Sequence, residues 1–126
     1  MLEKNNTSFA YNLGRFLAIG DYMQYSVHNV KGGSILSAGL VKLAKVRPME
    51  CIKVAYDRIH QYLSQIEHRP DKQGVIKRVE SLLNEVNTYL VAHAGMLSID
   101  EQVEMHRAYW DQRNAFFNKT NTNNKD

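Results

Sequence analysis

Apolar residues recur at steps of three and four along most of the chain, which is the spacing of one face of an α-helix. Five such stretches are predicted, over residues 8–30, 35–46, 48–67, 72–93 and 98–118. No stretch shows the alternation of apolar and polar residues between turn dipeptides that is typical of a half-buried strand. The pattern therefore predicts an all-α bundle of about five helices, in one domain over residues 1–118.

Residues that favour helix ends stand at the predicted boundaries. At the starts these are Ser8 or Thr7, Ser34, Pro48, Asp71, and the capping-box pair Ser98 and Glu101. Glycine, which easily takes the left-handed conformation that closes a helix, follows the first helix at 32–33 and the fourth at Gly95. Residues 119–126, KTNTNNKD, are polar and low in complexity, so we expect a disordered tail.

Length and composition limit the class of protein. The chain has 126 residues, of which 44% are hydrophobic and 23% charged, as in ordinary globular domains. No apolar run approaches the roughly 20 residues that cross a bilayer, and the polar N-terminus lacks the layout of a secretory signal. The single cysteine, Cys51, has no partner for an internal disulfide, which is typical of a reducing compartment. We therefore expect a cytoplasmic protein that does not contact a membrane.

Positive charge is concentrated in residues 31–58, which contain six basic residues and two acidic ones. The basic residues are Lys31, Lys42, Lys45, Arg47, Lys53 and Arg58. A patch of this kind either holds the phosphates of a nucleic acid or only solubilises a helix face. Lys53 and Arg58 lie about 140° apart around their helix, so one narrow groove cannot hold both.

The chain shows no pattern typical of an active site. The five histidines lack metal-ligand spacing, and Gly32-Gly33 lacks the lysine and preceding strand of a phosphate loop. Glu104 and Asp111, two turns apart, fit a solvated helix face better than an acid–base pair. We expect no enzyme activity, no metal and no cofactor.

Aromatic residues gather near the end of the last predicted helix. These are Tyr109, Trp110, Phe116 and Phe117. Four aromatic rings within nine residues cannot all face one core, so we predict that this segment forms a subunit interface.

Two segments resemble a known family. AYNLGRFLAIGDYMQ, residues 10–24, is similar to the start of the C-terminal helical domain of the type I-C CRISPR large subunit. LSIDEQVEMHRAYWDQRNAFFNK, residues 97–119, resembles the closing helix of that domain. Between them, RPMECIKVAYDRIHQYL stands where the family has a proline followed by a long amphipathic helix. The family's usual segment before that proline, rich in Asn, Thr, Asp-Arg and Tyr, is not recognisable in residues 28–46.

Because this domain stands alone, it resembles the small subunit of a type I Cascade complex. That resemblance implies a non-catalytic bundle, present in more than one copy, that lines the belly of a guide-RNA complex and stabilises the R-loop. Its implied partners are the large subunit, the backbone subunits, further copies of itself, the backbone of a target or non-target DNA strand and, indirectly, the guide RNA. The resemblance also implies sequence-independent phosphate contacts by the basic residues of 31–58.

Two residues of the opening segment have open alternatives. Gly14 is expected to let a neighbouring helix approach closely. Arg15, like Arg113, either reaches an acidic or phosphate partner outside the chain or forms a salt bridge within the bundle. For the whole chain, the alternative function is a helical adaptor or regulator that binds only protein.

Overall fold

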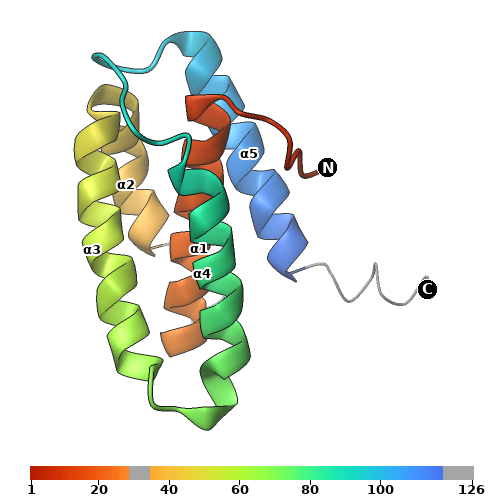
Figure 1. Cartoon of the computed structure of the whole chain (residues 1–126). Coiled ribbons are helices and arrows are strands. Elements are labelled where there is room, and N and C mark those ends of the chain that lie inside the picture. The colour runs from red at the N-terminus through yellow and green to blue at the C-terminus, as the bar shows by residue number, and fades with distance from the viewer. Residues whose placement is uncertain (29–34, 118–126) are drawn as a thin grey trace.

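The computed structural model describes residues 1–28 and 35–117, and within them it contains five α-helices and no strand (Figure 1). The elements are α1 (Phe9–His28), α2 (Ile35–Val46), α3 (Pro48–Ile66), a short 3₁₀ turn η1 (Pro70–Lys72), α4 (Gln73–Asn87) and α5 (Ile99–Phe117). The predicted all-α class is confirmed. Residues 32–34 and the predicted tail at 119–126 lie outside the described residues.

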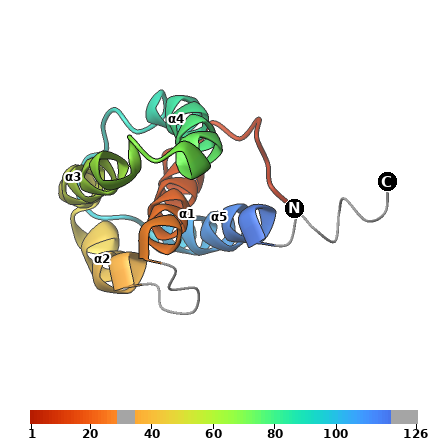
Figure 2. The same cartoon turned by 90° about the horizontal axis from the view of Figure 1, so that it is seen from below.

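Helix α1 is the centre of the bundle, with the other four helices arranged around it (Figure 2). Every residue from Ala10 to Asp21 is buried, including polar Asn12 and Arg15. The sequence predicted an amphipathic helix with one apolar face, and that expectation was incomplete. A helix surrounded on all sides buries its polar positions too, and each buried polar group then needs a partner.

The helices follow one another up and down the bundle (Figure 1). α1, α3 and α5 run in one direction, and α2 and α4 run in the other. Ring stacking of Tyr22 on Phe116, with centroids 4.1 Å apart, joins the later parts of α1 and α5. The parallel pair α1 and α5 forms the most extensive helix contact among the described residues.

Gly14 makes the close approach of α1 and α5 possible. A Cβ atom at this position would lie 2.1 Å from the carbonyl oxygen of Met105 and 2.8 Å from the Cβ of Ala108. Because the nearest obstacle is backbone, no side-chain rotation would relieve the clash. The role expected of Gly14 is confirmed, and it explains a glycine inside a helix at a cost of about 1 kcal/mol in helix propensity.

Several predicted helix ends are confirmed. The Tyr11 amide donates to Ser8 Oγ at 3.0 Å, so Ser8 rather than Thr7 caps α1. Pro48 is the first residue of α3. In the capping box, the Glu101 amide donates to Ser98 Oγ at 3.1 Å and the Ser98 amide donates to Glu101 Oε1 at 2.8 Å.

The boundaries of the fourth helix were predicted wrongly. α4 ends at Asn87, not at 93, and the backbone turns there through bonds from Tyr89 to Val86 and from Leu90 to Asn87. Leu90 fits the helical spacing because the connecting segment also buries it. Gly95 has a φ of 69° within that segment and does not close the helix.

The start of α4 also differs from the prediction. Asp71 lies in η1, where its carboxylate pairs with Arg69 at 3.1 Å, and it makes no cap for α4.

Candidate nucleic-acid interface

Five of the six predicted basic residues lie on the hairpin formed by α2 and α3. Arg47 is the single residue between the two helices. Its amide donates to the Leu43 carbonyl, and its carbonyl accepts a bond from the Cys51 amide. Since the helices are antiparallel, Lys42 and Lys53 lie at similar heights, about 6–8 Å along the axis from the turn. Lys42, Arg47 and Lys53 are all exposed, and we call these three residues the hairpin cluster. Lys31 lies outside the described residues.

Two other predicted residues do not join the hairpin cluster. Lys45 is half-buried and close to His106 of α5, where its positive charge helps burial to lower the pKa of the imidazole. It therefore faces α5. Arg58 is exposed, but it lies farther along α3 and about 140° around the helix from Lys53.

Acidic neighbours reduce part of the charge of the hairpin cluster. Arg47 pairs with Glu50 at 3.4 Å, and both side chains are well exposed. Lys53 lines a shallow depression on α3 together with Glu50 and Asp57. Within residues 1–28 and 35–117, Lys42 makes no salt bridge. Since an exposed ion pair is worth at most about 1 kcal/mol, a phosphate can displace Glu50 from Arg47 at small cost.

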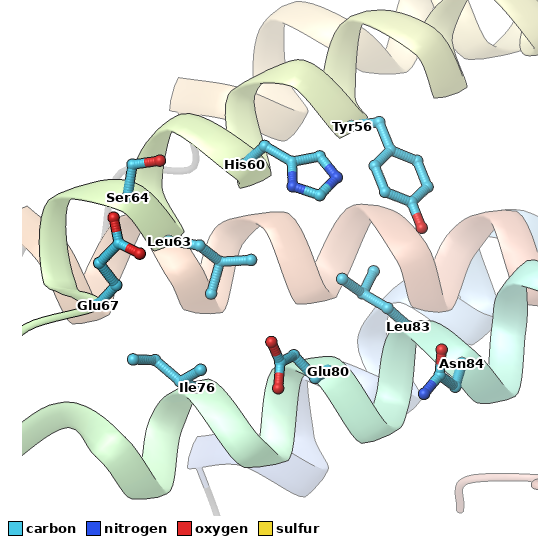
Figure 3. Close-up of a pocket in the computed structure, with 9 residues that line it drawn as sticks. All are labelled: Tyr56, His60, Leu63, Ser64, Glu67, Ile76, Glu80, Leu83 and Asn84. Atoms are coloured by element: carbon cyan, nitrogen blue, oxygen red, sulfur yellow. The ribbon is translucent and has the colours of Figure 1, made fainter.

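A groove lies elsewhere, between α3 and α4 (Figure 3). It has a volume of about 540 Å³. His60 of α3 and Glu67, directly after α3, line one wall, and Glu80 of α4 lines the other. Two carboxylates at its walls oppose the binding of a phosphate backbone. The hairpin cluster is thus the better candidate for a polyanion.

The buried polar residues of α1 have partners within the bundle. Arg15 Nη2 lies 2.8 Å from Glu85 Oε1 of α4, and its Nε donates to Gln112 Oε1 of α5 at 2.8 Å. Asp21 accepts a hydrogen bond from the Tyr109 hydroxyl and lies 3.7 Å from the Arg113 guanidinium. For both arginines the structure has an intramolecular salt bridge, the second of the two alternatives drawn from the sequence.

The four aromatic residues of α5 are divided between the core and the surface. Phe116 is 5% exposed and belongs to the core of this chain. Tyr109 bonds Asp21, and the Phe117 ring meets Tyr25 edge to face at 5.2 Å. Trp110 is 55% exposed. Three of the four therefore contact α1, and Trp110 is the member whose ring is open to a partner.

The side chains of Cys51 and Tyr11, which could act as a nucleophile or an acid, are buried. Burial raises the pKa of the Cys51 thiol to about 12, so the sulfur stays protonated and is a poor nucleophile. Burial is also the main cause that raises the pKa of Tyr11 to about 12, and its hydroxyl donates to Asp111 at 2.9 Å. Among the described residues, no three His, Cys, Asp or Glu side chains are placed to hold a metal ion.

Glu104 and Asp111 take part in an ion network on the surface. Arg107 lies 3.8 Å from each of the two carboxylates and also pairs with Glu3 of the N-terminal segment. These pairs fix residues 1–8 against α5. In the part of the chain that the structure covers, no helix is long and apolar enough to cross a membrane.

Sequence reasoning missed two features. The burial of α1 on all sides had a signal in the lack of any continuous polar stripe between residues 10 and 21. The groove between α3 and α4 had no signal in the sequence, because it depends on the distance between these two helices where they pack against α1.

These features define a class of protein, a helical bundle around a buried helix, with three exposed basic side chains on the α2–α3 hairpin. A model of the CRISPR-associated protein family Cas_Csd1 matches residues 1–117, and the chain belongs to this family. The match covers the whole described bundle, so the resemblance seen at both ends of the sequence is confirmed at the level of the family. No curated protein matches the chain.

Proposed function

We propose that the chain is the non-catalytic small subunit of a type I-C Cascade complex, an RNA-guided surveillance complex in the cytoplasm that serves antiviral defence. The observation that carries this proposal is the family match over residues 1–117. The proposal is also consistent with the surroundings of Cys51 and of the acidic residues of α5, which are those of a structural protein. The large subunit, the backbone subunits and further copies of the chain are the proposed protein partners.

The hairpin cluster is proposed to contact the DNA backbone within the complex. Lysine and arginine side chains neutralise phosphates and release counterions, and they do so without reading base sequence. An R-loop is a nearly balanced exchange of one duplex for another, so a few such contacts are enough to shift it. Lys42, Arg47 and Lys53 supply three exposed positive charges on one helical hairpin.

The test uses a guide-RNA complex purified without this subunit. We compare wild type with the triple variant Lys42→Ala, Arg47→Ala and Lys53→Ala, and with a control that loses three charges elsewhere, Lys4→Ala, Lys72→Ala and Lys77→Ala. Wild type and control are expected to restore binding of target DNA, and the hairpin variant is expected to restore less. Equal restoration by all three proteins would contradict the DNA contact.

If wild type restores no target binding at all and does not join the complex, this result would instead favour the adaptor function. One observation supports that second candidate. α5 exposes apolar side chains, among them Ile99 and Val103, that a protein partner could cover.

A further inference from the structure

Among the described residues, one face of α5 is largely uncovered. Ile99, Val103, His106 and Trp110 follow one another at steps of four, three and four. At 100° per residue they fall within an arc of about 60°, so they form one stripe along the helix. Ile99 is 78% exposed, Val103 64% and Trp110 55%. We call these four residues the α5 stripe.

Exposed apolar residues also lie where the segment before α5 meets the end of α2. The Leu97 amide donates to the Lys45 carbonyl at 2.8 Å, which holds the segment before α5 against the last turn of α2. The neighbours of these two residues, Met96 and Val46, are also exposed. The last turn of α2 and the first turn of α5 lie at the same end of the bundle (Figure 1). Exposed apolar side chains therefore lie at the end of α2 and directly before α5 as well as along the stripe.

The row of aliphatic side chains along the stripe is suited to a helix as its partner. Steps of four and three are those of a helix that packs side by side with another helix. Aliphatic Ile99 and Val103 offer no flat ring on which a nucleic-acid base could stack, whereas they fit between the side chains of a facing helix.

The charges beside the stripe indicate the polarity of that partner. On one side lies Lys45, near His106, with Lys42 one turn earlier on α2, and neither lysine makes a salt bridge within the described residues. On the other side lies Arg107, whose charge is matched by Glu3, Glu104 and Asp111. The unpaired charge on the α2 side of the stripe is therefore positive, whereas carboxylates outnumber Arg107 on the other side, and a partner with carboxylates on the side that faces α2 would complement it.

We propose that the α5 stripe binds an amphipathic helix of a partner protein that carries carboxylates beside its apolar face. The proposal rests on the proposed function, because it names the kind of surface through which the chain joins its protein partners. It limits the predicted aromatic interface to Trp110 and adds Ile99, Val103 and His106 to it.

The first test uses a model helix as the probe. Two peptides of about three heptads have leucines at the core positions, and one carries glutamate and the other lysine at the flanking positions. Trp110 is the only tryptophan in the chain, so its emission reports directly on the stripe. The glutamate peptide is expected to give a saturable blue shift with an affinity about tenfold tighter than the lysine peptide.

Three variants identify the surface. Val103→Asp is expected to weaken the affinity for the glutamate peptide by about tenfold or more. Val91→Asp, at another exposed valine outside the stripe, is expected to leave binding unchanged. Lys45→Glu is expected to reverse the preference between the two peptides. Equal binding of both peptides, no saturable shift, or equal effects of Val103→Asp and Val91→Asp would overturn the proposal.

Two further measurements separate the possible outcomes. Sedimentation shows whether wild type self-associates. If wild type forms dimers and Val103→Asp abolishes them, the partner of the stripe is a second copy of the chain and not an acidic helix. In the complex that lacks this subunit, Val103→Asp is expected to fail to incorporate while keeping its binding to single-stranded DNA. The hairpin variant is expected to incorporate and to bind less DNA. Because Lys42 belongs to the hairpin cluster and also lies beside the stripe, Val103→Asp and Lys45→Glu test the stripe without changing the hairpin cluster, and the stripe and the DNA contact therefore fail independently.

Discussion

Arg15 and Glu85 form an ion pair 2.8 Å long that joins the central helix to α4, although the arginine side chain is only 1% exposed. Gln112 of α5 accepts a second bond from the same guanidinium, so one side chain connects three helices. A buried charge is tolerated only when its hydrogen bonds are satisfied, and here both contacts come from residues far away in sequence.

Replacing Arg15 by Met should destabilise the bundle severely. The substitution leaves the buried Gln112 carbonyl without its donor and removes the ion pair, so we expect the free energy of unfolding to fall by about 3 kcal/mol. Urea denaturation measures this loss. Arg69→Met, which removes an exposed pair with Asp71, serves as the control and should change stability by less than about 1 kcal/mol. Similar losses in the two variants would show that Arg15 is not the central connection.

A Cβ at Gly14 should separate α1 from α5. We expect Gly14→Ala to cost about 1–3 kcal/mol, since the added atom meets the Met105 carbonyl and the helix axes must move apart. Gly39→Ala is the matched control, because nothing lies within 4 Å of the added Cβ there, and it should raise stability by up to about 1 kcal/mol. Thermal unfolding of both variants distinguishes these effects. A stabilised Gly14→Ala protein would contradict the packing described.

The capping box should make stability depend on acidic pH. The Ser98 amide and then the His93 side chain, at 2.8 Å, hold the pKa of Glu101 below its ordinary value of 4.5. A lowered carboxylate pKa contributes stability that is present above the unfolded-state pKa and is lost as the pH falls through the folded-state pKa. We expect Glu101→Gln to reduce this loss between pH 5 and 3, measured by urea denaturation at each pH. An unchanged pH profile would contradict the assignment.

Cys51 should be protected from alkylation in the native protein. Its thiol donates to the Leu40 carbonyl at 3.6 Å and is fully buried, and its pKa of about 12 leaves almost no thiolate at pH 8. We expect labelling by iodoacetamide only at the rate of unfolding, and rapid labelling in urea. Immediate labelling of the folded protein would show that the hairpin of α2 and α3 opens easily.

Much of the fold follows from local sequence, and the remainder depends on contacts that local sequence does not encode. The helix starts at Ser8, Pro48 and Ser98 were predicted because a cap is a local interaction. The end of α4 was not, since Leu90 continues the apolar spacing after the helix has ended.

The candidate site shows the same division. The basic segment was evident from composition, but Lys45 could not be separated from Lys42 until the position of α5 was known. The partners of Arg15 lie 70 and 97 residues away, so the sequence could only leave its two roles open.

The most direct test of the proposed DNA contact is the salt dependence of binding to a labelled single-stranded oligonucleotide. Each lost phosphate contact should reduce the slope of log K against log salt by about 0.7. We expect the variant Lys42→Ala, Arg47→Ala and Lys53→Ala to lose about 2 units of slope. We expect the control Lys4→Ala, Lys72→Ala and Lys77→Ala to keep the wild-type slope. Equal slopes for all three proteins, or no binding by wild type at low salt, would contradict the hairpin cluster as the DNA surface.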